Sequence, residues 1–223
     1  MMPRRKVFVF DLDDTLYKEV DYVKSAFQYI AHRLAEILPE VTCAAVYDTL
    51  WSVFMEGGDA FGEVIRQFGL TTYTKNDLLE WYWYHKPSIT LDAPVKETLR
   101  ILKSQGVDLA IITDGRQETQ QNKIDALGLT AYMSAVVIND NFKHLKPNKY
   151  SYRQIEKQFG SDCEFFYVGD NTAKDFIAPN ALGWTTVCLL DDGRNIHQQD
   201  FNGLSANMPK KIIKSLRYES FDS

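Results

Sequence analysis

Val7-Phe8-Val9-Phe10-Asp11-Leu12-Asp13-Asp14-Thr15-Leu16-Tyr17 is the stretch that decides the fold. It begins with an apolar run short enough to be a buried strand of a parallel sheet that is covered on both faces. Such sheets bind ligands beyond the carboxyl ends of their strands, where the strand order reverses. We therefore expect Asp11 and Asp13 at the rim of a cleft. An acidic turn that only caps a helix is the alternative for this stretch taken alone.

The composition limits the class of protein. A length of 223 residues allows one large domain or a domain with an insertion, and 45% hydrophobic with 25% charged residues is typical of a soluble globular protein. The net charge of −5 argues against nucleic acid as a partner. No apolar run approaches a membrane span. The three cysteines are widely spaced, which favours reduced thiols, so we expect a cytoplasmic protein that is a monomer or a homodimer.

Residues 17–87 have the apolar spacing of helices. We expect one helix over 21–38, a second over 43–55, and a third that contains 61–68. A fourth is expected to begin at the N-cap pair Asn76-Asp77 and to include the aromatic block 81–84, which we interpret as core. Four short amphipathic helices with short loops indicate a small helical bundle.

From residue 88 onward, strand and helix patterns alternate. The expected strands are 107–113, 135–138, 165–168 and 185–190, and the expected helices are 95–103, 117–127, 150–159, 173–182 (interrupted near Pro179) and 209–218. This alternation predicts a parallel sheet with right-handed crossovers. We therefore expect a three-layer, Rossmann-like α/β core of residues 1–16 and 88–223. Residues 17–87 would be an inserted helical-bundle cap that lies over the cleft as a lid.

Three further stretches at or after the predicted strand ends carry polar residues. They are Thr113-Asp114-Gly115, then Lys146 in the stretch 144–148, and Gly169-Asp170 with Asp175 five residues later. The carboxyl ends of parallel strands meet at one edge of a sheet, so these residues and Asp11 are expected to converge.

These four stretches resemble, in order, the four motifs of the haloacid dehalogenase superfamily. The pattern DxDxT corresponds to residues 11–15, the threonine to Thr113, the lysine to Lys146, and the pattern GDxxxxD to residues 169–175. The resemblance covers essentially the whole chain, and the insertion is similar to the small helical cap of the family's first cap class. The run 113–124 resembles small-metabolite phosphatases such as acylneuraminate 9-phosphatases and pyrimidine 5′-nucleotidases.

The resemblance implies a division of labour among the acidic residues. Asp11 would be the nucleophile and form an aspartyl-phosphate, and Asp13 would protonate the leaving oxygen and later accept a proton from water. Because halide needs no proton, an acid at position 13 points to phosphoryl transfer rather than dehalogenation. The carboxylates of Asp11 and Asp170, with the backbone carbonyl of Asp13, would hold Mg²⁺.

The remaining motif residues would bind the phosphoryl group. Lys146 would add positive charge, and Asp175 would hold Lys146 or a metal-bound water. The Thr113 hydroxyl and backbone N–H groups near Asp114 and Gly115 would donate to phosphoryl oxygens. Such countercharge is needed because two like charges 4 Å apart repel by about 4 kcal/mol at an effective dielectric constant near 20. Asp114 departs from the family, which more usually has Asn there.

We therefore predict a Mg²⁺-dependent phosphohydrolase that acts on a small soluble phosphomonoester. A sugar phosphomutase would use the same four motifs and is the alternative. A binding or regulatory protein that kept the fold is less favoured, because all the expected catalytic positions are occupied. A response-regulator receiver domain is rejected, because its acids follow the first and third strands without an insertion between them.

Overall fold

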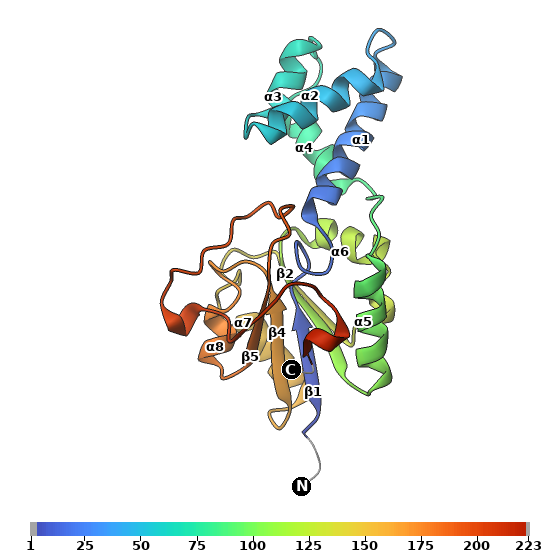
Figure 1. Ribbon diagram of the computed structural model, residues 1–223. Coiled ribbons are helices and arrows are strands. Elements are labelled where there is room, and N and C mark those ends of the chain that lie inside the picture. The colour runs from blue at the N-terminus through green and yellow to red at the C-terminus, as the bar shows by residue number, and fades with distance from the viewer. Residues whose placement is uncertain (1–3, 222–223) are drawn as a thin grey trace.

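The computed structural model describes residues 4–221 and contains a six-stranded sheet in which every neighbouring pair of strands is parallel (Figure 1). The strands are β1 (Lys6–Phe10), β2 (Asp108–Asp114), β3 (Ala135–Asn139), β4 (Glu164–Gly169), β5 (Thr185–Leu189) and β6 (Lys211–Ile213). Their order is β3-β2-β1-β4-β5-β6, so the sheet grows in opposite directions on the two sides of β1. The predicted parallel sheet is confirmed, and Asp11 follows the strand at which the order reverses.

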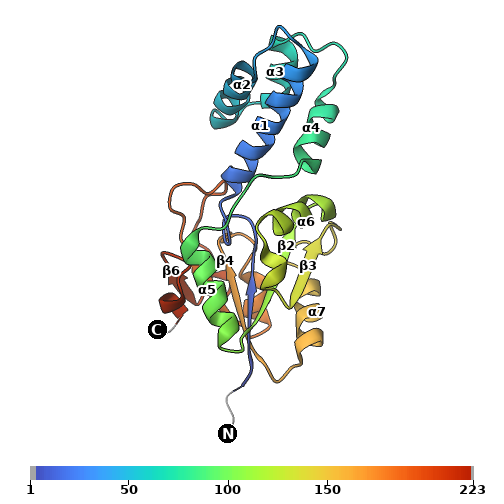
Figure 2. The same cartoon turned by 90° about the vertical axis from the view of Figure 1, so that its right-hand side faces the viewer.

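Helices cover both faces of this sheet (Figure 2). They are α5 (Ala93–Ser104) and α6 (Gln117–Ala126) on one face, with α7 (Tyr150–Phe159) and α8 (Ile177–Ala181) on the other. The alternation of side chains along β1 explains the two cores. Phe8 and Phe10 pack with Leu99 of α5, whereas Val7 and Val9 pack in the cluster that contains Tyr152 of α7. The three-layer α/β architecture is therefore confirmed.

Four of the helices that lie between β1 and β2 in the chain stand beyond the carboxyl ends of the strands (Figure 1). They are α1 (Glu19–Ile37), α2 (Cys43–Met55), α3 (Ala60–Gln67) and α4 (Lys75–Tyr84). They share an apolar cluster of their own, in which Leu34, Leu50 and Leu78 are fully buried. The four predicted helices are confirmed, and none of the helices in residues 4–221 is long and apolar enough to cross a membrane.

The start of α4 differs from the prediction. Thr74, rather than the pair Asn76-Asp77, is the N-cap, and its hydroxyl accepts a hydrogen bond from the Asp77 N–H. The Asp77 carboxylate accepts in return from the Thr74 backbone N–H, so the two residues form a capping box. Asp77 is therefore the third helical residue and not part of the cap.

The predicted helix over 209–218 is wrong. Residues 211–213 form β6, which adds a sixth strand beside β5, and a short 3₁₀ turn follows at Tyr218–Phe221. Ile213 is buried and Ile212 is half exposed, which is the alternation of a strand. The Leu190 N–H donates to the Ile213 carbonyl, so β6 satisfies an edge of the sheet that a helix would have left open.

The predicted helix over 173–182 is shorter in the structure. It begins only at Ile177 and ends at Ala181, with Pro179 inside its first turn. A proline is tolerated there because the first N–H groups of a helix have no partner within the helix. The residues before it form the turn that carries Asp175.

Candidate active site

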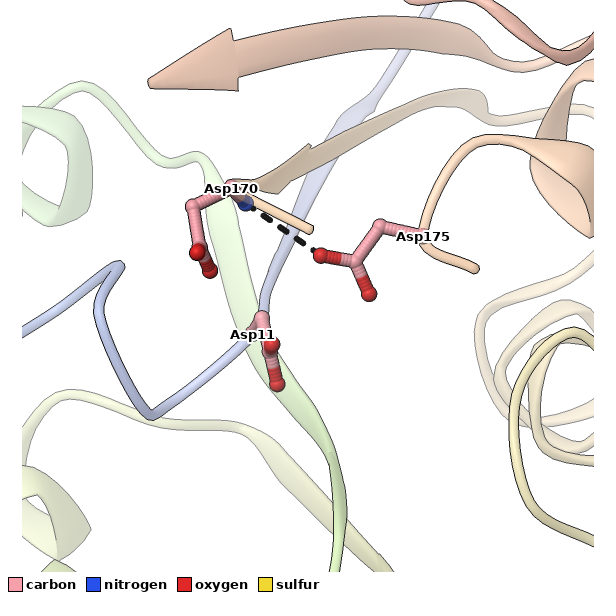
Figure 3. Close-up of side chains that lie close together, drawn as sticks. All are labelled: Asp11, Asp170 and Asp175. Atoms are coloured by element: carbon pink, nitrogen blue, oxygen red, sulfur yellow. Dashed lines mark hydrogen bonds between the residues drawn. The ribbon is translucent and has the colours of Figure 1, made fainter. Parts of the chain in front are cut away.

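Three buried carboxylates converge at the carboxyl ends of β1 and β4. Asp11 follows β1, Asp170 follows β4, and Asp175 lies in the turn after it (Figure 3). Each offers an oxygen that lies within 4.8 Å of the oxygens offered by the other two, and all three residues are buried. The sequence prediction that these acids meet is therefore realised in the fold.

Asp175 organises the turn that follows β4. One of its carboxylate oxygens accepts from the backbone N–H groups of Asp170 (3.2 Å) and Asn171 (2.9 Å), and Figure 3 shows the first of these bonds. A Cβ at Gly169 would lie 2.5 Å from that same carboxylate oxygen. Position 169 therefore has room only for glycine, which gives the pair Gly169-Asp170 a steric reason.

Lys146 lies between the two sides of the cluster. Its ammonium group is 2.8 Å from a carboxylate oxygen of Asp11 and 2.8 Å from one of Asp175, and the lysine side chain is fully buried. It also donates to the Tyr167 hydroxyl at 3.1 Å. Burial alone would lower the pKa of Lys146, but the two carboxylates raise it well above its usual range. The lysine is therefore charged and supplies a fixed positive charge beside Asp11.

The positive charge near Asp11 and Asp170 is too small to offset their burial and mutual repulsion. Burial raises the pKa of Asp11 to about 7, because the attraction of Lys146 offsets that penalty only in part and Asp175 adds repulsion. Burial, with repulsion from Asp11 and Asp175, raises the pKa of Asp170 to about 8. Such a cluster favours a bound cation or bound protons.

Asp13 has a different environment. Its carboxylate accepts hydrogen bonds from Lys123 (2.8 Å), from the Gln120 amide (2.9 Å) and from the Tyr17 hydroxyl. Burial would raise the pKa of Asp13, but the charge of Lys123 and these three hydrogen bonds lower it below its ordinary value. Asp11 and Asp13, two residues apart, therefore have pKa values that the fold moves in opposite directions.

Asp114, the departure from the family pattern, has a partner for its charge. Its carboxylate accepts from the Asn139 amide (2.9 Å) and from the Lys146 backbone N–H (3.2 Å). The Lys174 ammonium donates to it at 3.2 Å. Asp114 thus joins the segments after β2, β3 and β4, and Lys174 balances the extra negative charge.

Thr113 is buried and oriented by Gln120. The Thr113 hydroxyl oxygen accepts a hydrogen bond from the Gln120 amide at 2.6 Å, which leaves the hydroxyl hydrogen free to donate elsewhere. Gly115 has a φ of +150°, and a Cβ there would lie 3.0 Å from the Gln120 side chain. The predicted phosphate-binding residues 113–115 therefore lie against the first turn of α6.

The segment after β5 completes the site, and the sequence analysis did not predict this contribution. The Asn195 amide donates to a carboxylate oxygen of Asp170 at 3.0 Å, and its carbonyl oxygen accepts from Lys18 at 2.6 Å. The Gln199 amide donates to the Asp170 backbone carbonyl. No motif marked residues 191–208, because these contacts join parts of the chain that have no fixed spacing.

Thr15, the last residue of the DxDxT pattern, also orients Asp170. Its hydroxyl donates to the second carboxylate oxygen of Asp170 at 3.1 Å. Asp170 is therefore held by Thr15 and Asn195, one on each of its two oxygens. The sequence analysis identified Thr15 only as part of the DxDxT pattern and did not predict its hydrogen bond to Asp170.

A pocket opens on this edge of the sheet. Its lining residues are Asp11, Asp13, Asp14, Glu19, Thr113, Asp114, Asp170, Asn171, Lys174 and His197. Within the described residues, Glu19 is the one lining residue that comes from residues 17–87. Burial and repulsion from Asp13 raise the pKa of Glu19 to about 8. The remainder of the helical bundle does not line this pocket in the conformation described.

The donor set fits a hard divalent cation. Carboxylate oxygens are the ligands that Mg²⁺ prefers, and Asp11 and Asp170 each present one in this pocket. Asp175 does not line this pocket, and its two oxygens accept from Lys146 and from two backbone N–H groups, so it is the poorer donor. The cluster therefore suits a divalent metal held chiefly by Asp11 and Asp170.

Two relatives of this chain are named as phosphatases. The chain is 24% identical over 217 residues to the glyceraldehyde 3-phosphate phosphatase of Methanocaldococcus jannaschii, which covers 93% of this chain and 95% of the relative. It is 26% identical over 229 residues to the phosphoglycolate phosphatase of Agrobacterium fabrum, with 95% of both chains covered. Both relatives are named as phosphatases, as the resemblance implied. The phosphate esters in their names differ from those of the acylneuraminate 9-phosphatases and pyrimidine 5′-nucleotidases that the run 113–124 resembles.

A solved structure shows the same fold. The magnesium-bound HAD-hydrolase YfnB of Bacillus subtilis aligns with a TM-score of 0.63 at 17% identity, over 96% of each chain. The family model described as "Haloacid dehalogenase-like hydrolase" matches residues 8–189, from β1 to the end of β5. The match spans more than half of the sequence, so the chain belongs to the haloacid dehalogenase-like hydrolase family.

Proposed function

We propose that this chain is a Mg²⁺-dependent phosphatase that hydrolyses a small soluble phosphomonoester, such as a sugar phosphate or a nucleoside 5′-monophosphate, through an aspartyl-phosphate. The relatives, named as phosphatases of small phosphorylated compounds, support this class of reaction. The observation that carries the proposal is the pocket in which Asp11, charge-paired to Lys146 at 2.8 Å, lies beside a second acid, Asp13. A nucleophile and a proton carrier are thus present at one site.

The reaction has two halves. In the first, an Asp11 carboxylate oxygen attacks phosphorus and the ester P–O bond breaks. Asp13, which takes up a proton before this step, delivers it to the leaving oxygen. In the second, a water molecule attacks the aspartyl-phosphate and gives a proton to Asp13, and the bond between phosphorus and Asp11 breaks to release phosphate. Lys146 stays charged in both halves and attracts the phosphoryl oxygens, while the Thr113 hydroxyl and the N–H groups near Asp114 and Gly115 donate to them.

Residues of this chain would also hold the metal. The carboxylates of Asp11 and Asp170 and the backbone carbonyl of Asp13 are the proposed ligands, with Thr15 and Asn195 fixing the Asp170 carboxylate. When bound, Mg²⁺ would offset the charge of the phosphate dianion. Asp175 is proposed to support the site through Lys146 rather than to bind the metal.

We further propose that residues 17–87 are a cap domain on a core of residues 1–16 and 88–223. Because the pocket takes only Glu19 from the helical bundle in this conformation, the bundle would have to move to enclose a substrate. The hinges would lie near 16–20 and 86–94, where the chain leaves and re-enters the core. A cytoplasmic location and a monomeric or homodimeric state also remain predictions.

Substitution of the nucleophile tests the function. Asp11→Asn should abolish phosphate release from a panel of sugar phosphates and nucleotides with Mg²⁺, and it should remove the phosphoenzyme, because an amide does not attack phosphorus. Asp140→Asn, at an exposed aspartate after β3, is the matched control and should keep full activity. Activity of Asp11→Asn within about tenfold of the parent, a change near 1.4 kcal/mol in barrier, would remove Asp11 from this role.

The phosphomutase alternative gives a different product. Release of phosphate equal to substrate consumed indicates hydrolysis, whereas transfer of phosphate to another position of the same sugar indicates a mutase. Absence of both reactions across the panel would favour a binding or regulatory protein with this fold.

A further inference from the structure

Lys123 forms an ion pair with Asp13, the proposed acid–base residue, and belongs to none of the four motifs. Its ammonium group lies 2.8 Å from a carboxylate oxygen of Asp13, and its side chain is only 4% exposed. It comes from α6, which is 110 residues away from Asp13 in the chain. Asp13 is thus held by a side chain from helix α6 and not only by its own loop.

The surroundings of Lys123 leave it little freedom. Its ammonium group lies 4.4 Å from the centre of the Tyr22 ring and 3.9 Å from a Glu19 carboxylate oxygen. Both residues belong to the first turns of α1, and the Tyr22 hydroxyl donates to the Tyr82 carbonyl of α4. The base of the helical bundle therefore encloses Lys123 against Asp13.

Gln120, one turn earlier on α6, fixes the second oxygen. Its amide nitrogen donates both to Asp13 at 2.9 Å and to the Thr113 hydroxyl at 2.6 Å. The two oxygens of the Asp13 carboxylate thus have separate donors on one helix, which sets the plane of the carboxylate as well as its position. The Tyr17 hydroxyl also donates to the oxygen that Lys123 contacts, so loss of Lys123 removes the charge and one of two donors from that oxygen.

Stability alone does not account for this buried pair. Replacing a buried ion pair by apolar residues is often neutral or stabilising, because two charges lose their hydration. A buried lysine also needs a partner, yet the nearer carboxylate here is the pocket residue Asp13 and not Glu19. The arrangement favours a role in the chemistry of Asp13.

We propose that Lys123 is a positioning residue that aims the Asp13 carboxyl group at the leaving oxygen of the substrate. This inference rests on the proposed phosphatase function and adds a residue to it. A misaimed Asp13 slows the transfer of a proton to the leaving group, so the loss should depend on how much that group needs a proton. The charge of Lys123 also lowers the pKa of Asp13, so its removal by itself would favour the protonated acid and would oppose this loss. A loss for poor leaving groups therefore reports the position of Asp13. For a leaving group that is stable as an anion, the misplacement of Asp13 should change the rate little.

The test uses a series of substituted phenyl phosphates whose phenols differ in acidity but not in shape near phosphorus. The parameter kcat/KM reports the steps up to release of the phenol, so its dependence on phenol acidity measures the proton delivered in the first half-reaction. In Lys123→Met, kcat/KM should fall about 100-fold for the least acidic phenol, the lower end of what a positioned acid contributes. For the most acidic phenol it should change less than about threefold.

Two controls and a substitute variant make the result decisive. Lys123→Arg, which keeps the charge, should restore the shallow dependence of the parent, and Gln121→Met on the same helix should not alter it. If Lys123→Met does not fold, Lys123→Gln replaces it, because it keeps a donor without the charge. An equal loss for every phenol, or no loss at all, in a folded variant overturns the inference. No hydrolysis by the parent enzyme would instead contradict the proposed function.

Discussion

Replacing Lys146 by methionine should destabilise the protein strongly, because this lysine is the cation of a fully buried site. Its side chain is fully buried and forms ion pairs of 2.8 Å with both Asp11 and Asp175. Removing one partner of such a network leaves uncompensated buried charge and typically costs about 3–5 kcal/mol. We expect Lys146→Met to lower the free energy of unfolding by that amount at slightly alkaline pH.

The cost should depend on pH in a definite direction. Burial raises the pKa of Asp11 to about 7, and Lys146 is the main influence that opposes this rise, so the variant should have a still higher pKa at Asp11. A carboxyl group whose pKa is higher in the folded than in the unfolded state loses stability as the pH rises between the two values. In the variant this loss continues above pH 7, by at most about 1.4 kcal/mol per pH unit for one proton.

Urea unfolding in the presence of a chelator measures this effect. The parent and Lys146→Met are compared at about pH 6, below the raised pKa of Asp11, and at about pH 8.5. Lys143→Met, at an exposed lysine of the same loop, is the matched control and should change stability little. A difference below about 1 kcal/mol at the higher pH, or one that does not grow with pH, would refute the reasoning.

Four further predictions concern the metal, Asp114 and the cap. In chelator, the free energy of unfolding of the parent should fall as the pH rises from about 4 to about 8. The reason is that the folded protein retains protons on Asp11 and Asp170 that the unfolded chain releases. Mg²⁺ should reverse the fall, and calorimetry with and without the ion measures both effects. A chelator should also stop phosphate release, Mg²⁺ should restore it and Ca²⁺ should inhibit, because Ca²⁺ prefers more and longer oxygen contacts; full activity in excess chelator would contradict this. Asp114→Asn should change the free energy of unfolding by less than about 1 kcal/mol, because its partner Lys174 is one-third exposed. The variant should also have a lower KM, because Lys174 is then free to bind the phosphate, and an unchanged KM would argue against this role of Lys174. Proteolysis at the exposed loop 57–59 should slow when Mg²⁺ and inorganic phosphate are bound together, whereas equal rates with and without them would argue against a closing cap.

The sequence by itself determined five strands of the sheet, most of the helices and the central acids. Apolar runs such as 7–10 predict buried strands, and the carboxyl ends of parallel strands must lie at one edge. The meeting of Asp11, Asp170 and Lys146 therefore followed from topology before any distance was known. Helix ends with local signals were also predictable, as for the helix over 43–55, whose predicted bounds equal those of α2.

Local patterns failed where the deciding partner was distant in the chain. The segment 209–218 was predicted to be helical, but the open edge of β5 offered backbone groups to Ile213 and made it a strand. The charge of Asp114 looked unbalanced until the fold placed Lys174 against it. In the first case tertiary hydrogen bonds outweighed a weak local preference, and in the second a distant residue supplied the countercharge.

Only the tertiary structure decided what surrounds the catalytic acids. Lys123 lies 110 residues from Asp13, and Asn195 lies 25 residues beyond Asp170 in a segment without a repeating pattern. Such contacts obey no spacing rule, because they depend on how helices and loops pack rather than on the period of one element. The sequence therefore identified the acids, whereas packing determined their charge partners, and the opposite pKa shifts of Asp11 and Asp13 follow from that packing.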